Sequence, residues 1–229
     1  MTEVQADRGS WAPIAVLTVL LVGLVGPVFG PIAQLAKSQW GVRGGSGVVV
    51  LLFAVLFALF AAGTLRWVAG RGGSARDLGW RVPTRTSAVV AAALFGLFWA
   101  AFNVMGYVHQ VDSTANPMEL STLRWATALG GVAIACCEDL VTRGFIMNHL
   151  KAAGVGAWLQ SLTSSAVFAL CHSLWTLSVA GFIVAFVYGL ILSGFFVWGR
   201  RSLTPVVVAH GLALFLGEPF LTMFMLAAG

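Results

Sequence analysis

The sequence predicts an all-α, polytopic integral membrane protein, a helix bundle with about seven transmembrane helices. Hydrophobic residues make up 59% of the 229 residues and charged residues only 9%, which is far too apolar for a water-soluble domain. The apolar residues fall into runs of about 20 residues, the length that an α-helix needs to cross a bilayer. Because the connections between these runs are short, we expect residues 1–229 to form a single membrane domain.

Seven apolar segments are expected to cross the membrane in turn. They are residues 12–36, 48–68, 87–108, 123–150, 157–175, 177–198 and 205 to the C-terminus. Glycines and prolines between Gly26 and Pro31 predict a kink or a break near the end of the first segment. Four arginines and Pro83 predict that residues 71–86 form a loop against the lipid headgroups. The fourth segment is long enough to tilt or to project from the bilayer.

The basic residues predict how the chain is oriented. The formal net charge is +5, but we do not expect nucleic acid binding, because the basic residues lie in short loops where membrane orientation accounts for them. The side that holds the N-terminal tail and the loops after the second, fourth and sixth segments carries nine of them: Arg8, Arg66, Arg71, Arg76, Arg81, Arg85, Lys151, Arg200 and Arg201. The opposite side carries three: Lys37, Arg43 and Arg124. We therefore predict a plasma-membrane protein, in contact with membrane lipids, whose N-terminus is cytoplasmic.

Three charged residues interrupt the fourth apolar segment. Glu138, Asp139 and Arg143 lie in the stretch GGVAIACCEDLVTRGFIMNH, and a charge at mid-bilayer costs about 2.5 to 3.5 kcal/mol on insertion scales. Asp139 and Arg143 are four residues apart and share a helix face, so we expect them to form an ion pair. That pair would leave Glu138 free for chemistry. The alternative interpretation is an ion network that only locks helices together.

Two histidines lie in later apolar segments, His172 after VFALC and His210 after PVVVA. Each alone is typical of an interhelical hydrogen bond, but two histidines with a buried carboxylate indicate a site. Histidine and carboxylate can share general-base work on a water molecule, or Glu138, His172 and His210 can hold zinc. The residues leave both open, although no H-E-x-x-H motif is present.

Other candidate residues carry weaker signals. The three cysteines lie inside apolar segments, so no disulfide framework is indicated. His109 lies at a segment end and is interpreted as interfacial. His149, at the cytoplasmic end of the fourth segment, is expected to interact with the last carbonyls of its helix rather than to catalyse. Glu218 is either a residue of a substrate pathway or a side chain that reaches the outer interface.

Taken together, the motifs resemble those of the CPBP family of intramembrane proteases, which includes the CAAX prenyl endopeptidases and the bacterial Abi proteins. That family carries E-E-x-x-x-R, F-x-x-x-H and H-x-x-x-N on three membrane helices. EDLVTR at 138–143 is similar to the first motif, Phe168 to His172 matches the second, and His210 begins the third. The resemblance covers about residues 75–216, including DLGWRVP at 77–83 and the lead-in RRSLTPVVVA before His210.

The resemblance implies an intramembrane endopeptidase that cleaves a peptide or a lipid-modified protein near the cytoplasmic membrane face. Glu138 and His172 would activate the attacking water, His210 would bind the developing oxyanion, and Arg143 would support the site. Two positions depart from the pattern: Asp139 replaces a glutamate, and Leu214 stands where the family has asparagine. Leucine cannot donate a hydrogen bond. The alternatives are therefore a non-proteolytic membrane scaffold and an enzyme acting on prenyl lipids in the same cavity.

Overall fold

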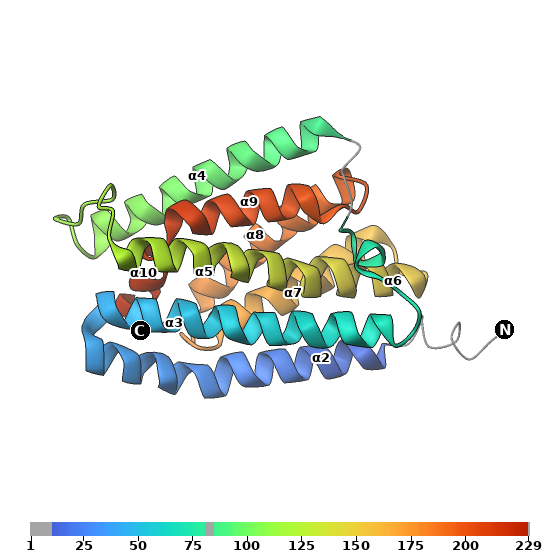
Figure 1. Ribbon diagram of the computed structural model, residues 1–229, viewed down its shortest axis with the longest axis horizontal. Helices are drawn as coiled ribbons and strands as arrows, with labels where there is room; N and C mark the ends of the chain where they lie inside the picture. Colours follow the sequence, from blue (N-terminus) through green and yellow to red (C-terminus); the bar gives the residue numbers. More distant parts are fainter. Residues whose placement is uncertain (1–10, 81–84, 229) are drawn as a thin grey trace.

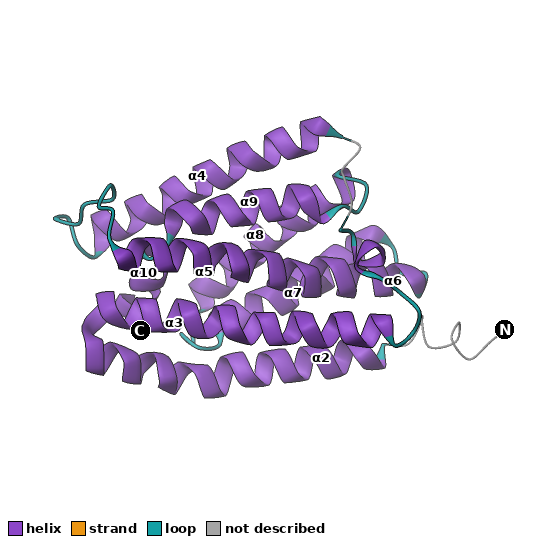
Figure 2. Cartoon of the chain, viewed as in Figure 1, coloured by secondary structure: helices purple, strands orange, loops and turns teal. Residues whose placement is uncertain are grey.

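Helices and short connections make up the described part of the chain, residues 11–80 and 85–228 of the computed structural model, and it contains no strand (Figures 1 and 2). The all-α prediction is therefore confirmed. The N-terminal tail with Arg8, together with Arg81 and Pro83, lies outside the described residues. Most of the helices lie side by side and run along the long axis of the molecule.

The first two helical arms form a hairpin, shown in blue and cyan in Figure 1. They comprise α2 (Ala12–Gly23), the π-helical turn η2 (Leu24–Val28) and α3 (Phe29–Ala69). The interruption expected near Gly26 takes the form of that π turn rather than a break. The loop expected before residue 48 is absent, because the chain reverses at Gly41 alone, with φ 67° and ψ −179°. Glycine adopts this positive φ without the steric cost that a side chain adds.

The remaining elements follow the expected order closely. They are η3 (Ala75–Leu78), α4 (Thr86–Gln110), α5 (Thr122–Asp139), the π-helix η4 (Leu140–Met147), α6 (Asn148–Ala152), α7 (Ala157–Ser173), α8 (Val179–Trp198), α9 (Leu203–Gly217) and α10 (Phe220–Ala228). Without a break, α5, η4 and α6 form the long fourth helix that the sequence predicts.

The last apolar segment is not one straight span, contrary to expectation. After α9 the chain bends by 70° into α10 at Glu218 and Pro219. Among the described residues, three helices are long and apolar enough to cross a membrane, or four if this bent pair counts as one span. One of the three, residues 12–69, contains both arms of the hairpin. A membrane bundle is therefore supported, while the count of seven spans stays a prediction.

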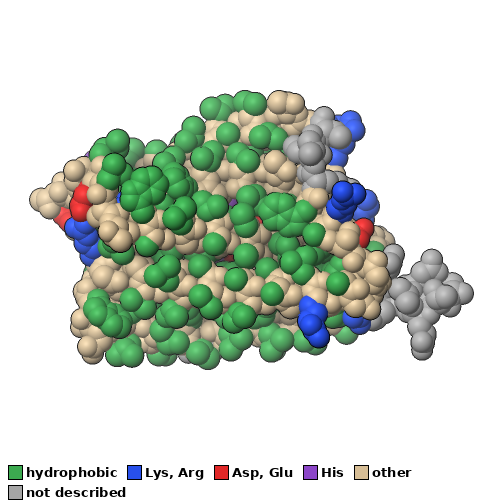
Figure 3. Space-filling view, viewed as in Figure 1, with side chains coloured by type: hydrophobic (Ala, Val, Ile, Leu, Met, Phe, Trp, Pro, Cys, Tyr) green, Lys and Arg blue, Asp and Glu red, His purple; other side chains and the backbone are tan. Residues whose placement is uncertain are grey.

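Apolar side chains cover the sides of the bundle, and charged side chains gather at its two ends (Figure 3). Exposed apolar residues occur on several helices, among them Trp40, Leu59, Leu94, Phe98, Leu129, Trp158 and Val187. This distribution is expected where lipid tails rather than water surround a protein. The loops at 70–80, 153–156 and 199–202 lie at one end, on the right of Figure 1, and residues 111–121 lie at the other.

The interior is built around α9, which packs mainly against α4 and α5, while α7 packs against α8 and η4. This packing brings the charged stretch of the fourth helix between the helices that carry the two histidines.

Candidate active site

The charged stretch of the fourth helix lies in the bundle interior, at the junction of α5 and η4. Glu138 and Asp139 end α5, Arg143 follows in the π-helix, and none of the three side chains is exposed. Thr142 Oγ1 donates a hydrogen bond to the backbone oxygen of Glu138 at 2.7 Å. π-Helical turns are rare and frequently occur at functional sites, where they change the direction in which side chains point.

Both terminal nitrogens of Arg143 have buried partners, whereas its Nε has no hydrogen-bond partner in the described part of the chain. Its Nη1 donates to Asp139 Oδ1 at 3.0 Å and to Thr142 Oγ1 at 2.8 Å, and its Nη2 donates to the carbonyl of Gly189 at 3.3 Å. The guanidinium also lies 4.4 Å from the ring centre of Phe168, at a distance that favours a cation–π contact. The ion pair predicted between Asp139 and Arg143 is therefore present.

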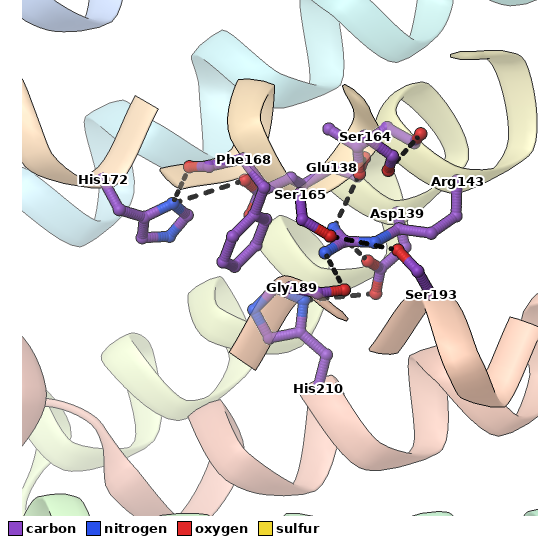
Figure 4. A network of polar contacts seen from close by, with 11 residues as sticks. Glu138, Asp139, Arg143, Ser164, Ser165, Phe168, His172, Gly189, Ser193 and His210 are labelled. Carbon is purple, nitrogen blue, oxygen red and sulfur yellow. Dashed lines mark hydrogen bonds and ion pairs between the residues drawn. The ribbon is translucent and has the colours of Figure 1, made fainter. Parts of the chain in front are cut away.

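Glu138 is the exception in this network, because neither oxygen of its carboxylate has a hydrogen-bond partner in the described part of the chain. Its nearest ionisable neighbour is His172, whose Nδ1 lies 3.6 Å from Glu138 Oε1 (Figure 4). That distance is too long for a hydrogen bond, but it permits a charge interaction when the histidine is protonated.

His172 is oriented by the residue one helical turn before it. Its Nδ1 lies 2.9 Å from the carbonyl oxygen of Phe168, and its ring stacks on the Phe168 ring at 4.2 Å between centroids. A carbonyl only accepts hydrogen bonds, so Nδ1 carries the proton and, in a neutral ring, Nε2 carries the lone pair. The imidazole is therefore presented as a base.

His210 contacts the other carboxylate of the pair. Its Nδ1 lies 3.1 Å from Asp139 Oδ2, and its side chain is 2% exposed (Figure 4). Asp139 thus uses one oxygen for Arg143 and the other for His210. The sequence does not predict the contact between His210 and Asp139, because nothing in it indicates how α9 is rotated against α5.

A cavity of about 790 Å³ meets this network, and both histidines line it together with Leu214. Its other walls come from the second half of α4, the first half of α8 and α10. Glu138 does not line the cavity and lies behind His172. The structure therefore brings the three predicted residues together, but only the two histidines face the open space directly.

Glu218 lies outside this cavity, at the bend between α9 and α10. Its side chain is 3% exposed, and its carboxylate accepts hydrogen bonds from the backbone N–H and the hydroxyl of Thr222 at 3.3 and 2.9 Å. Arg124 donates to the carbonyl of Glu218 and, at 2.5 Å, to that of Leu216. These contacts hold the bend between α9 and α10, and Glu218 is buried rather than at an interface.

The two histidines at the segment ends differ in their surroundings. His109 lines the cavity near the end of α4, whereas His149 is buried against the rings of Trp67 and Phe145.

The arrangement does not fit a zinc site. Nowhere in residues 11–80 and 85–228 are three or more His, Cys, Asp or Glu side chains grouped so that they could hold a metal ion. Among the ligands that the sequence suggests, His210 is turned toward Asp139 and His172 toward the carbonyl of Phe168. We therefore derive no step of the reaction through a metal.

Comparison with models of known protein families matches residues 120–216 to the type II CAAX prenyl endopeptidase Rce1-like family. Residues 120–216 are therefore similar to an Rce1-like domain. This confirms the resemblance to CAAX proteases, and the matched range contains the charged pair, the arginine and both histidines. No curated protein and no solved structure matches the chain.

The Rce1-like domain extends from the connection before α5 to the end of α9. The apolar helices and the family match together make this an integral membrane protein whose residues 120–216 are similar to those of CAAX proteases. Part of the cavity wall, contributed by α4 and α10, comes from outside the matched range.

Proposed function

We propose that the protein is an intramembrane endopeptidase that hydrolyses a peptide bond with a water molecule activated by Glu138 and His172. The observation that carries this proposal is a fully buried carboxylate without a hydrogen-bond donor, 3.6 Å from a histidine that lines a large cavity. Burying such a group is costly. A role in catalysis explains why the site keeps it, whereas a scaffold needs no unpaired carboxylate.

The reaction follows from the side-chain geometry. The oxygen of a water molecule attacks the carbonyl carbon of the scissile bond, and the proton passes to the Glu138–His172 pair. Glu138 stabilises the imidazolium when His172 holds this proton. The tetrahedral intermediate carries a negative oxygen. His210, protonated on both ring nitrogens, donates a hydrogen bond to this oxygen from Nε2 while its Nδ1–H donates to Asp139. The pair then returns the proton to the leaving amine as the C–N bond breaks.

The walls of the cavity indicate the class of substrate. Most of its lining is aromatic or aliphatic, including Phe98, Phe102, Met105 and Val184. We therefore propose a hydrophobic peptide segment or a lipid-modified protein as the substrate. The same apolar lining favours, as the second candidate, an enzyme that acts on a prenyl lipid.

The direction in which the cavity extends indicates the side of the membrane from which substrate enters. The cavity extends from the histidines toward His109 and Gln110, the end of the bundle where residues 111–121 lie. The Lys and Arg count predicts that this end faces away from the cytoplasm, whereas the resemblance implies cleavage near the cytoplasmic face. We propose entry from the non-cytoplasmic half, because the charge count follows from this chain's own residues.

A cleavage assay tests the proposed function. Purified protein in liposomes is given a panel of fluorogenic hydrophobic peptides, with and without a prenyl group, and in parallel a set of prenyl lipids. We expect peptide cleavage that falls by about 100-fold or more in Glu138→Gln, because the amide keeps the shape but cannot act as a base. Glu119→Gln is the matched control, since Glu119 is exposed and pairs with Arg43.

Equal rates in wild type and Glu138→Gln contradict the catalytic role. Conversion of prenyl lipids without peptide cleavage selects the second candidate. If neither substrate class reacts, the non-proteolytic scaffold is the remaining interpretation.

A further inference from the structure

Tyr188 lies beside His210, lines the same cavity as both histidines, and has no role in the reaction proposed above. It belongs to α8, is 4% exposed, and lines the cavity with His172 and His210. Its ring packs edge to face on His210 with 5.6 Å between centroids. The other rings around it are those of Phe95 at 5.6 Å, Trp99 at 4.5 Å and Phe168 at 6.0 Å.

The hydroxyl of Tyr188 has no hydrogen-bond partner among the described residues. Burying a donor without a partner is unfavourable, and phenylalanine fills almost the same volume without that cost. Two of the surrounding rings belong to phenylalanines, Phe95 and Phe168. Ring packing alone therefore does not explain why this position carries a hydroxyl.

The proposed hydrolysis explains the hydroxyl through the charge that it creates. Transition states of acyl transfer are stabilised by donors placed around the developing oxyanion, and His210 supplies one such donor. One turn after it, Leu214 lines the same cavity but has no donor to offer. Tyr188 contacts His210 from another helix and brings a donor to the same region.

We propose that Tyr188 is a catalytic residue whose hydroxyl, together with Nε2–H of the protonated His210 ring, donates a hydrogen bond to the oxyanion of the tetrahedral intermediate. The proton stays on the phenol, so no group is transferred. This inference rests on the proposed endopeptidase activity and names the donor that compensates for Leu214.

Asn103 is the competing candidate, because its Nδ2 is also buried without a partner and its side chain lines the same cavity. It lies beside Gly217, where an added Cβ would be 3.4 Å from Nδ2. Gly217 is seven residues beyond His210 on α9, about 10 Å along the helix axis. Asn103 is therefore placed toward the outer part of the cavity, while Tyr188 touches the histidine itself.

The test compares single hydroxyl deletions in the full chain, reconstituted in liposomes with a peptide that wild type cleaves. Tyr188→Phe is expected to lower kcat by about 100-fold or more while KM changes by less than about threefold. The matched control is Tyr107→Phe. Tyr107 is the other tyrosine of the chain; it is 6% exposed and packs on Phe220 away from the histidines. Thermal unfolding in detergent should show Tyr188→Phe to be as stable as wild type or more stable.

A second variant checks that Tyr188→Phe loses kcat because a hydrogen-bond donor to the oxyanion is missing. Introducing Leu214→Asn into Tyr188→Phe should recover part of the lost kcat, because the amide offers a donor one turn from His210. Asn103→Leu should lower kcat far less than Tyr188→Phe does.

Each contrary outcome has a distinct meaning. Wild-type kcat in Tyr188→Phe, or a loss of kcat matched by a loss of thermal stability, overturns the inference and leaves the endopeptidase proposal standing. A loss of kcat in Asn103→Leu but not in Tyr188→Phe assigns the donor to Asn103 instead. No cleavage of any peptide by wild type overturns the endopeptidase proposal, and this inference with it.

Discussion

Asp139 Oδ2 lies 3.1 Å from His210 Nδ1, while the other oxygen of the same carboxylate holds Arg143 at 3.0 Å. One buried side chain thus connects the fourth helix to α9 and also neutralises the buried arginine. Since an ionised carboxylate only accepts hydrogen bonds, His210 presents Nδ1 as the donor to it. The orientation of the histidine therefore depends on the carboxylate that also binds Arg143.

Asp139→Asn should consequently affect both stability and activity. Removing one partner of a buried ion pair leaves an uncompensated charge, and we expect the free energy of unfolding to fall by about 3 to 5 kcal/mol. Peptide cleavage should fall as well, because the amide orients His210 less strictly. Chemical unfolding in detergent and the liposome cleavage assay measure the two effects. Asp139→Glu keeps the charge and is the control; a loss as large as that of Asp139→Asn would argue against the role of charge.

Gly189→Ala tests whether the position of Arg143 matters to the reaction. An added Cβ would lie 3.2 Å from Arg143 Nη2 and 3.1 Å from Ser165 Cβ, so the guanidinium must shift. We expect the protein to lose about 1 to 3 kcal/mol of stability through overpacking and to cleave more slowly. Gly194→Ala on the same helix is the matched control, because nothing lies within 4 Å of its added Cβ. Indistinguishable behaviour of the two variants would show that the Gly189 contact is unimportant.

Leu214→Asn alone should not accelerate the enzyme if Tyr188 already supplies the second donor. The new amide would be buried without a hydrogen-bond partner that it needs, and this costs free energy. We therefore expect an unchanged or lower rate of peptide cleavage. Leu214→Met is the control for changes of shape only. One oxyanion donor contributes roughly 10²- to 10³-fold to the rate. If Leu214→Asn raises the cleavage rate by a measurable part of that factor, no other residue replaces the missing donor at this position.

The orientation of the bundle can be read from cysteine accessibility. In a chain with Cys136, Cys137 and Cys171 replaced by alanine, a single cysteine is placed at exposed Ala75 or exposed Ser113, at opposite ends of the bundle. The Lys and Arg count predicts that a membrane-impermeant maleimide labels Ser113→Cys in intact cells and Ala75→Cys only after permeabilisation. The reverse pattern would place the cavity end at the cytoplasmic face, as the family resemblance implies.

The fold class, one ion pair and the location of the candidate site can be predicted from the sequence alone. The long apolar runs force a helical membrane bundle, because backbone N–H and C=O groups in lipid must be satisfied within each segment. The spacing of four between Asp139 and Arg143 predicts their ion pair, which is present, since residues four apart share a helix face. Buried ionisable groups mark the candidate site because burying a charge in lipid is energetically costly.

The tertiary structure decides what depends on the rotation and packing of one helix against another. Only the packing of α9 against α5 brings His210 to Asp139, and only the position of α8 brings Tyr188 to His210. The reversal at Gly41 and the bend after α9 also depend on single backbone angles that apolar periodicity does not encode. The physical reason is that in lipid all apolar faces of a helix are nearly equivalent, so shape complementarity and a few polar contacts fix the rotation.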